Sequence, residues 1–413
     1  MNMARRVAEP TYRRYIVNEL ERYDEADMVY SRVDRGEVIP PELIPPSGNS
    51  GSPVHRIFSY DPDAIPRNGF SQADYALRWA GRTVDYLIRQ NLYAREMKPT
   101  LPPMEVYDRV AVAERIKDVA RWFGADLVGI TELNRQWVYS RLGDHSHKLG
   151  LAGEVGDPIE LPEYYRYAVV IACEMDYEHI KRSPAVEGAT DLGYSQMAFA
   201  AVSVAKYIQE LGYHALPNGN DTALSIPLAV DAGLGEMGRS GLLITERYGP
   251  RVRLSKVFTD LPLAVDRPVD LGVQHFCETC AKCAKRCPAQ ALSKGERTAE
   301  ANNMSNNPGM LKWPVDAERC IGWWLRNRAH CTVCIRTCSF NKPDASWHRA
   351  ATKVVGSTRA LDKTLVWLDD ALGYGGQKLN WRLTPGGPAR PPLSSSPSPV
   401  AQEAASLITE TGR

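Results

Sequence analysis

The spacing of apolar residues predicts three helices before residue 212. Aromatic and aliphatic side chains recur at helical intervals between residues 70 and 92, namely at Tyr75, Trp79, Tyr86 and Leu87. A second set marks one helix face after residue 107, formed by Val110, Ala113, Ile116, Ala120 and Phe123. A third helix is expected over 195–211, with an apolar face of Met197, Ala201, Val204, Ile208 and Leu211. Gly212 is expected to end it.

Runs of aliphatic and β-branched residues predict strands between these helices. Residues 127–130 indicate a short strand, and the β-branched run at 167–173 indicates a buried one. A further short strand is expected over 213–216, and residues 251–261 alternate like a strand. The glycine-rich segment 233–241 predicts a turn. Together these elements predict an α+β fold.

The two ends of the chain lack this pattern. Residues 1–60 are rich in charge, proline and tyrosine, with an extended loop over 38–53, so we expect this region to wrap over a core. The proline- and serine-rich stretch 385–399 belongs to a tail of roughly thirty residues that is expected to be disordered. The expected domains are an N-terminal wrapping region (1–104), a core (105–270), a cysteine domain (271–345) and a C-terminal extension with the disordered tail (346–413).

Composition and charge describe an ordinary globular protein. Its 413 residues are 44% apolar and 24% charged, and its formal net charge is +1. No global field therefore attracts nucleic acid or a membrane surface. We find no apolar run of about 18 residues that would predict a membrane span. Arg5 and Arg6 lack the apolar stretch of a twin-arginine export signal, so a cytoplasmic location is expected, unless the sequence is an exported form with its signal trimmed.

Eight of the nine cysteines are clustered, which indicates metal binding. The ninth, Cys173, ends the strand at 167–173 and is expected to be an inert packing residue. A disulfide framework would instead be spread through a small secreted domain. The first run has the spacing C-x2-C-x2-C-x3-C-P and contains Cys277, Cys280, Cys283 and Cys287. The second run contains Cys320, Cys331, Cys334 and Cys338.

This spacing predicts two [4Fe–4S] clusters. In two-cluster ferredoxins three closely spaced cysteines bind one cubane, and the fourth ligand comes from the other run. By this rule one cluster is bound by Cys277, Cys280, Cys283 and Cys338, and the other by Cys287, Cys320, Cys331 and Cys334. Zinc, the weaker alternative, usually takes separate C-x2-C pairs. Ser339 stands where proline often follows the second run, but this position is not a ligand.

Several short motifs occur in a fixed order along the chain. They are GYS at 193–195, GNDTALS at 219–225, the glycine turn at 233–241, YGPRVR at 248–253, NPG at 307–309, KW at 312–313 and NKPD at 341–344. Together with the cysteine domain they resemble the corrinoid-dependent reductive dehalogenases over roughly residues 105–375. The resemblance implies a nitroreductase-like core followed by a ferredoxin-like domain with two clusters. It also implies a cobalamin-type corrinoid, bound base-off.

The resemblance further implies a reaction and its residues. Reductive dehalogenation of an organohalide uses two electrons and one proton and releases halide, with cob(I)alamin reduced through the two clusters. Tyr194 matches the proton donor of the family, and Asn220 and Arg253 match its neighbours. A guanidinium beside a tyrosine stabilises the phenolate and makes the tyrosine a better acid. Without the resemblance, these three would be interpreted as a helix-cap or core tyrosine, a turn asparagine and a surface charge.

The expected corrinoid contacts lie in two loops. Thr222 and Ser225 belong to the motif at 219–225, and Gly235 and Gly238 belong to the glycine turn. Backbone N–H groups of such a turn can contact a phosphate or an amide, although a plain turn is the alternative. The turn also matches the dinucleotide pattern G-x-G-x-x-G, but the acidic partner is missing at the expected offset.

Other side chains near these motifs have weaker assignments. His147 follows Asp144 with a spacing that differs by one from D-x-H-x-x-G, so we expect a surface-loop histidine instead of a cobalt ligand. Trp313, Trp323 and Trp324 flank the second cysteine run. They are expected to line the substrate cavity, to shield a cluster or simply to pack.

Two other functions compete with dehalogenation. An epoxyqueuosine reductase, which modifies tRNA, has the same cofactors but is expected to use an acidic proton donor and a basic surface. The net charge of +1 and the Gly193-Tyr194 motif argue against it. The other is a non-catalytic iron–sulfur and corrinoid electron carrier, which does not explain the full upstream core. The expected partners are an organohalide and a separate low-potential donor of ferredoxin or flavodoxin type, without nucleic acid; a membrane anchor is left open.

Overall fold

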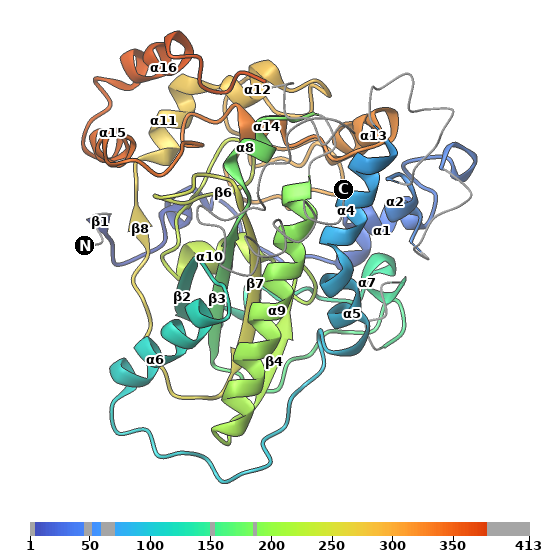
Figure 1. Ribbon diagram of the computed structural model, residues 1–413, viewed down its shortest axis with the longest axis vertical. Helices are drawn as coiled ribbons and strands as arrows, with labels where there is room; N and C mark the ends of the chain where they lie inside the picture. Colours follow the sequence, from blue (N-terminus) through green and yellow to red (C-terminus); the bar gives the residue numbers. More distant parts are fainter. Residues whose placement is uncertain (1–4, 45–51, 59–70, 149–152, 185–187, 378–413) are drawn as a thin grey trace, which may run out of the picture. The chain divides into compact units, whose positions relative to one another are not determined.

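An antiparallel sheet carries the core of the protein. The structure is a computed structural model that describes residues 5–44, 52–58, 71–148, 153–184 and 188–377. The strand order is β2 (Leu127–Glu132), β3 (Tyr167–Glu174), β7 (Val252–Thr259) and β4 (Ala215–Asn218). Neighbouring strands are antiparallel throughout. Strands β2, β3 and β7 lie where the sequence predicts them, and the fold mixes helices and sheet as expected (Figure 1). Strand β4 overlaps the expected 213–216 only in part, because it starts at Ala215 and continues to Asn218.

Both faces of this sheet are buried against helices. On one face, Val169 of β3 packs in a core with α6 (Arg109–Trp122) and α9 (Gly188–Glu210). On the other face, Val170 packs in a second core with α10 (Ser225–Asp231). Successive residues of a strand point to opposite faces, so a strand that is buried on both sides is a continuous apolar run. Figure 1 shows the long helix α9 lying along the sheet.

The single helix expected over 70–92 is interrupted. The structure has α4 (Gln72–Gly81) and α5 (Thr83–Asn91), separated at Arg82, where φ is −93° and ψ is 0°. The interruption lies directly against α9, because a Cβ placed on Gly81 would be 3.1 Å from a backbone nitrogen of that helix. The sequence pattern does not reveal the break, since neither proline nor glycine stands at position 82.

Two residues assigned to apolar helix faces point to solvent instead. Leu87 is 61% exposed, because the break at Arg82 changes the phase of α5 relative to α4. Val110, in the first turn of α6, is 60% exposed. The remaining aliphatic residues of the predicted α6 face, Ala113, Ile116 and Ala120, are buried as expected.

Helix α9 begins at Gly188, before the expected start at residue 195. Tyr194 therefore lies inside the helix and not ahead of it. The polar residue Asp191 interrupts the apolar period but is fully buried. It is buried because two arginines of the α4–α5 region pair with its carboxylate. Such a long-range ion pair leaves no trace in local periodicity.

The N-terminal segment is attached to the second core through one buried carboxylate. In η1 (Thr11–Tyr15), the hydroxyl of Tyr12 donates to Asp231 Oδ1 at 2.6 Å. The indole nitrogen of Trp137 donates to the other oxygen of Asp231 at 3.1 Å. Burial raises the pKa of Asp231 to about 6. These contacts hold the segment on the sheet.

The N-terminal region also builds an apolar cluster of its own. Helices α1 (Val29–Asp34) and α2 (Pro53–Arg56) contribute to it, and α13 (Ala317–Asn327) inserts Ile321. Its buried members are Val33, Ile39, Ile44, Val54, Ile57, Phe58 and Ile321. The region thus contributes a small core in addition to covering one, which the sequence pattern did not indicate.

The cysteine region and the segment after it are helical. Its helices are α11 (Val273–Cys280), α12 (Lys282–Arg286), α13, α14 (Val333–Arg336), α15 (Ser346–Ser357) and α16 (Asp362–Ala371). The short strands pair as β1 (Arg5–Arg6) with β8 (Val269–Asp270) and β5 (Glu236–Met237) with β6 (Leu243–Ile244). Among the described residues, the remaining helices are η2 (Glu25–Asp27), η3 (Pro41–Leu43), η4 (Arg135–Trp137), α7 (Asp144–Lys148) and α8 (Tyr177–Ile180).

The predicted disordered tail, with its proline-rich stretch 385–399, lies outside the described residues. The described residues pack as one unit, and the division into domains stays a prediction. Within the described ranges, no helix combines the length and the apolar character needed to cross a bilayer.

Candidate active site

Three residues that are far apart in sequence meet beside one cavity. Tyr194 lies on α9, Asn220 on the loop after β4, and Arg253 on β7. The side-chain amide nitrogen of Asn220 is 3.3 Å from the Tyr194 hydroxyl oxygen. The guanidinium carbon of Arg253 lies 4.7 Å from the centroid of the Tyr194 ring, within the range of a cation–π contact. The structure therefore brings together the trio named from the sequence.

Gly193, the residue before Tyr194, leaves space that a larger residue would fill. A Cβ placed on Gly193 would lie 3.0 Å from Cγ of Arg253, which is tighter than nearly all real Cβ contacts. The missing side chain thus lets Arg253 pack against α9 next to Tyr194. Arg251, two residues before Arg253, is fully buried and pairs with Glu174 at 2.7 Å. It is therefore engaged outside the trio.

The loop that carries Asn220 is held by a buried lysine. Lys256 of β7 is fully buried, and its Nζ donates to the carbonyl oxygens of Gly219 (2.7 Å), Asp221 (2.9 Å) and Ala223 (2.7 Å). It also donates to Ser225 Oγ at 3.0 Å. Burial lowers the pKa of Lys256 to about 8. The sequence pattern does not single out Lys256, because a lysine within a predicted strand gives no sign that four acceptors surround it.

The cavity beside the trio has a volume of about 270 Å³ and mixed chemistry. Its aromatic wall includes Tyr30, Phe58 and Trp324, and the ring centroids of Phe58 and Trp324 are 5.7 Å apart. The imidazoles of His145 and His330 also line it, and burial lowers the pKa of both. Two buried imidazoles that favour the neutral form, together with aromatic rings, make a site suited to an uncharged or planar ligand. Trp324 thus lines a cavity, one of the roles expected for it.

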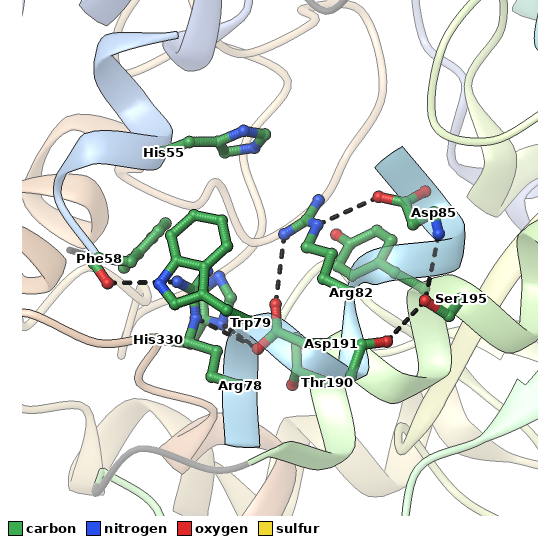
Figure 2. Close-up of polar contacts among 12 residues, drawn as sticks. His55, Phe58, Arg78, Trp79, Arg82, Asp85, Thr190, Asp191, Ser195 and His330 are labelled. Atoms are coloured by element: carbon green, nitrogen blue, oxygen red, sulfur yellow. Dashed lines mark hydrogen bonds and ion pairs between the residues drawn. The ribbon is translucent and has the colours of Figure 1, made fainter. Parts of the chain in front are cut away.

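A buried network of alternating charges runs beside the cavity. Its five ion pairs, in order, are Arg78–Asp191 (3.2 Å), Asp191–Arg82 (3.4 Å), Arg82–Asp85 (3.1 Å), Asp85–Arg89 (3.3 Å) and Arg89–Asp221 (3.6 Å). All six side chains are at most 5% exposed. Figure 2 shows the part of this network around Asp191, with Arg78 on one side and Arg82 on the other. Buried charges of this kind require partners, and here each one has at least one.

A second cavity, of about 300 Å³, adjoins the first. Both are lined by Leu224, Ile226 and Pro227 at the start of α10. The second is also lined by Gly238, Gly241, Asn307, Lys312 and Trp313, which all belong to motifs recognised in the sequence. A Cβ placed on Gly238 would lie 3.8 Å from Sγ of Cys277. Gly238, in the wall of the second cavity, therefore lies next to the first cysteine run.

The four expected corrinoid contacts have different surroundings. Gly238 lines the second cavity and Ser225 the first. Thr222 is buried, and its hydroxyl donates to Asn218 Oδ1 at 2.7 Å. A Cβ on Gly235 would be 2.1 Å from the carbonyl oxygen of Ile244, so this glycine permits the close approach of the chain at β5 and β6. The cofactor role of all four stays a prediction.

The eight clustered cysteines fall into two neighbourhoods. Burial raises the pKa of Cys277, and the nearby thiols of Cys338, Cys280 and Cys283 add to the effect. Burial likewise raises the pKa of Cys334, with contributions from Cys331, Cys320 and Cys287. Cys283 also interacts with Cys334, so the two neighbourhoods adjoin. Cys338 thus lies with the first run and Cys287 with the second.

Cys173 and His147 lie outside the two cysteine neighbourhoods. Cys173 is fully buried in the first core, and burial raises its pKa to about 12, as expected of an inert thiol. His147 lies on α7 and not on the expected surface loop, and its Nδ1 is 2.9 Å from the carbonyl oxygen of Gly153. In the described part of the chain, no three His, Cys, Asp or Glu side chains are placed to hold a single metal ion.

Comparison with known proteins identifies similar sequences and folds. No family model matches the chain. The chain is 35% identical over 325 residues to a tetrachloroethene reductive dehalogenase of Sulfurospirillum multivorans, covering 74% of this chain and 64% of that protein. It is 39% identical over 295 residues to a tetrachloroethene reductive dehalogenase of Desulfitobacterium hafniense, covering 63% of this chain and 53% of that protein. The chain thus spans between half and two thirds of the length of these relatives.

Solved structures show the same fold over most of the chain. A catabolic reductive dehalogenase in complex with 3-bromo-4-hydroxybenzoic acid matches with a TM-score of 0.68 and 25% identity, covering 91% of this chain and 49% of that one. A reductive dehalogenase structure described as suggesting a mechanism for B12-dependent dehalogenation matches with a TM-score of 0.66 over the same share of this chain and 50% of that one. An epoxyqueuosine reductase of Lactococcus garvieae is more distant, at 25% identity over 182 residues, 40% of this chain and 42% of that protein.

Proposed function

We propose that this chain is a member of the reductive dehalogenase family and catalyses the reductive dehalogenation of an organohalide. The observation that carries the proposal is the convergence of Asn220 and Arg253 on Tyr194, which lines one cavity together with Asn220. In the reaction, two electrons and one proton convert a carbon–halogen bond into a carbon–hydrogen bond and a halide ion. The chain has to bind the organohalide, exclude water and deliver that proton.

Tyr194 is the proposed proton donor. Its O–H bond breaks, the proton passes to the substrate carbon, and the hydroxyl oxygen is left negatively charged. The Arg253 guanidinium, 4.7 Å from the ring, stabilises that charge, because it is fixed in place before the charge develops. Asn220, 3.3 Å from the hydroxyl, orients it and can donate to the halogen or the departing halide. The aromatic wall of the cavity limits access of competing water.

A corrinoid of the cobalamin type is the proposed cofactor, bound base-off. When bound, it supplies the low-potential reduction of the carbon–halogen bond. The adjoining cavities support this assignment, since the second is lined by Gly238, Asn307 and Lys312 and shares the start of α10 with the cavity beside Tyr194. The nearness of Gly238 to Cys277 would set such a cofactor close to the first cysteine run.

Two [4Fe–4S] clusters are the proposed route of electrons to the corrinoid. The donor set is chemically suitable, because cubane clusters are bound by four cysteine thiolates each. The two thiol neighbourhoods support a division in which Cys338 joins the first run and Cys287 joins the second. A nitroreductase-like core followed by a ferredoxin-like domain is the corresponding proposed architecture. The proposed electron donor is a separate ferredoxin or flavodoxin, and the proposed location is the cytoplasm.

Halide release is the decisive measurement. The full chain, purified without oxygen and supplied with a corrinoid and reconstituted clusters, is incubated with a strong reductant and a panel of chlorinated and brominated alkenes and phenols. We expect halide release from at least one compound and its loss in Tyr194→Phe. Absence of halide release from the whole panel by corrinoid-loaded enzyme would reject the function. Turnover of an epoxyqueuosine-containing tRNA stem-loop would instead favour the alternative activity.

A further inference from the structure

We propose that Arg82, at the break between α4 and α5, is a positioning residue that holds a second guanidinium on the ring of the proton donor Tyr194. The guanidinium carbon of Arg82 lies 4.2 Å from the centroid of that ring, nearer than the 4.7 Å of Arg253. The inference rests on the proposed function, since it concerns the residue assigned to proton transfer there. It adds a residue from a part of the chain outside the motifs found in the sequence.

The backbone is fixed to α9 on both sides of Arg82. The hydroxyl of Ser195 donates to the carbonyl oxygen of Gly81 at 2.6 Å and accepts from the backbone nitrogen of Asp85 at 3.1 Å. These contacts tie the residues before and after the break to the residue that follows Tyr194, as Figure 2 shows for Ser195 and Asp85. The absence of a side chain on Gly81 permits the close approach to α9. The chain around the break is thus held against α9, and this contact places Arg82 next to Tyr194.

The side chain of Arg82 is fixed by two carboxylates. Its Nε lies 3.1 Å from Asp85 and its Nη1 lies 3.4 Å from Asp191, and both carboxylates are fully buried. Burial alone would lower the pKa of Arg82, but the charges of Asp85 and Asp191 and the nearby tyrosines together outweigh it, and the pKa lies above its ordinary value. Asp191 lies one helical turn before Tyr194 on α9, so its carboxylate holds the Arg82 guanidinium next to the Tyr194 ring. Arg82 therefore stays charged and in place.

This arrangement favours the state that follows proton transfer. A cation on a neutral tyrosine ring gains a modest attraction, whereas the same cation beside a phenolate gains a full charge–charge interaction. The difference lowers the energy of the step in which the Tyr194 O–H bond breaks, and only such differential interactions accelerate a reaction. The departing halide takes the electron pair of the carbon–halogen bond, and the proton from Tyr194 forms the new carbon–hydrogen bond with the two electrons delivered to the substrate. The two electrons come from the reduced cofactors of the proposed function.

Arg78 offers a matched control within the same network. It is 1% exposed, and its Nε lies 3.2 Å from the same Asp191 carboxylate. Its guanidinium carbon lies over the rings of Phe58 (4.3 Å) and Trp79 (4.8 Å), in place of the Tyr194 ring. Replacing either arginine by glutamine removes one buried cation and one partner of Asp191. Only the change at Arg82 removes a charge from the proton donor.

The test compares Arg82→Gln, Arg82→Lys and Arg78→Gln as full chains loaded with clusters and corrinoid. We expect Arg82→Gln to lower kcat by on the order of 10² with KM within about twofold, the loss typical of removing one preorganised charge stabiliser. The solvent deuterium isotope effect on kcat should rise, because proton transfer becomes slower than the other steps. Arg82→Lys should restore part of kcat, and Arg78→Gln should keep kcat while lowering the unfolding midpoint, by less than Arg82→Gln does because Arg82 also pairs with Asp85.

The outcomes separate this inference from the proposed function. If wild-type enzyme releases halide but Arg82→Gln and Arg78→Gln lower kcat equally, or the isotope effect stays at its wild-type value, the positioning role is wrong and the function stands. If wild-type enzyme releases no halide, the function itself fails. Should Arg82→Gln not fold, Arg82→Lys decides the matter: a lowered kcat with a raised isotope effect supports the role, and wild-type values for both overturn it.

Discussion

The side-chain amide of Asn220 lies 3.3 Å from the hydroxyl oxygen of Tyr194, although 26 positions separate the two residues. The contact depends on β7, which carries Arg253 on the side facing α9 and Lys256 on the side facing the Asn220 loop. One central strand therefore orders both neighbours of the tyrosine.

Lys256→Met is expected to release the loop that carries Asn220. Three carbonyl oxygens lose their buried donor, so the free energy of unfolding should fall by roughly 3 kcal/mol. Halide release should fall with it, because Asn220 is no longer held beside Tyr194. Urea unfolding and initial rates measure the two effects. Lys206→Met, at an exposed lysine paired with Glu210, is the control and should change neither. Wild-type stability in Lys256→Met would show that the loop holds its own conformation.

Gly193→Ala is expected to separate activity from stability. The new Cβ would lie 3.0 Å from Cγ of Arg253, so the arginine has to move away from the Tyr194 ring. Alanine is favoured over glycine within a helix by about 1 kcal/mol, which offsets the crowding. We therefore expect a clear loss of kcat with an unfolding midpoint near that of the wild type. A variant with wild-type kcat would mean that Arg253 tolerates displacement.

Glu25 is expected to make the protein less stable as the pH rises. It is fully buried, and its carboxylate accepts from the backbone nitrogen of Gly143 at 2.9 Å. Burial raises the pKa of Glu25 from 4.5 to about 7. Between these values the folded chain binds a proton that the unfolded chain has lost, so the stabilisation is complete below 4.5 and is lost as the pH rises through 7. The expected loss is roughly 3 kcal/mol.

Glu25→Gln is expected to remove this dependence. Urea unfolding of the variant and of the wild type, compared at about pH 5.5 and about pH 8, measures the slope of stability with pH. Glu154→Gln, at an exposed position, is the control and should keep the wild-type slope. An unchanged slope in Glu25→Gln would assign the pH dependence to other groups.

Cys338→Ser is expected to impair the cluster of the first cysteine run although it lies in the second. Its thiol lies with Cys277 and Cys280, so the loss should lower the iron content from about eight to about four atoms per chain. Iron analysis and electron paramagnetic resonance of the reduced protein check this. Cys173→Ala, far from both runs, should keep the full iron content. Loss of the signal of the second cluster instead would contradict the exchange of ligands between the runs.

Local patterns in the sequence were sufficient to predict the elements whose structure depends on residues near one another along the chain. The strands β2, β3 and β7 and the buried face of α9 follow from the spacing of apolar residues, which burial on a sheet or a helix face imposes directly. The cysteine spacing likewise indicates two sets of metal ligands, because three corners of a cubane must be reached from one tight loop. The trio of Tyr194, Asn220 and Arg253 was named through its resemblance to a family, and no local pattern would have singled it out.

Only the tertiary structure decided the surroundings of Tyr194. Arg82, Asp191 and Lys256 are charged residues, which periodicity assigns to a surface, yet all three are buried. Each is buried because a partner from a distant segment compensates its charge or its hydrogen bonds. The ion pair between Arg82 and Asp191 is also the reason that the apolar period did not reveal the true start of α9. A sequence records which residues can be charged, whereas the fold determines which charges meet, and in this protein they meet at the proposed proton donor.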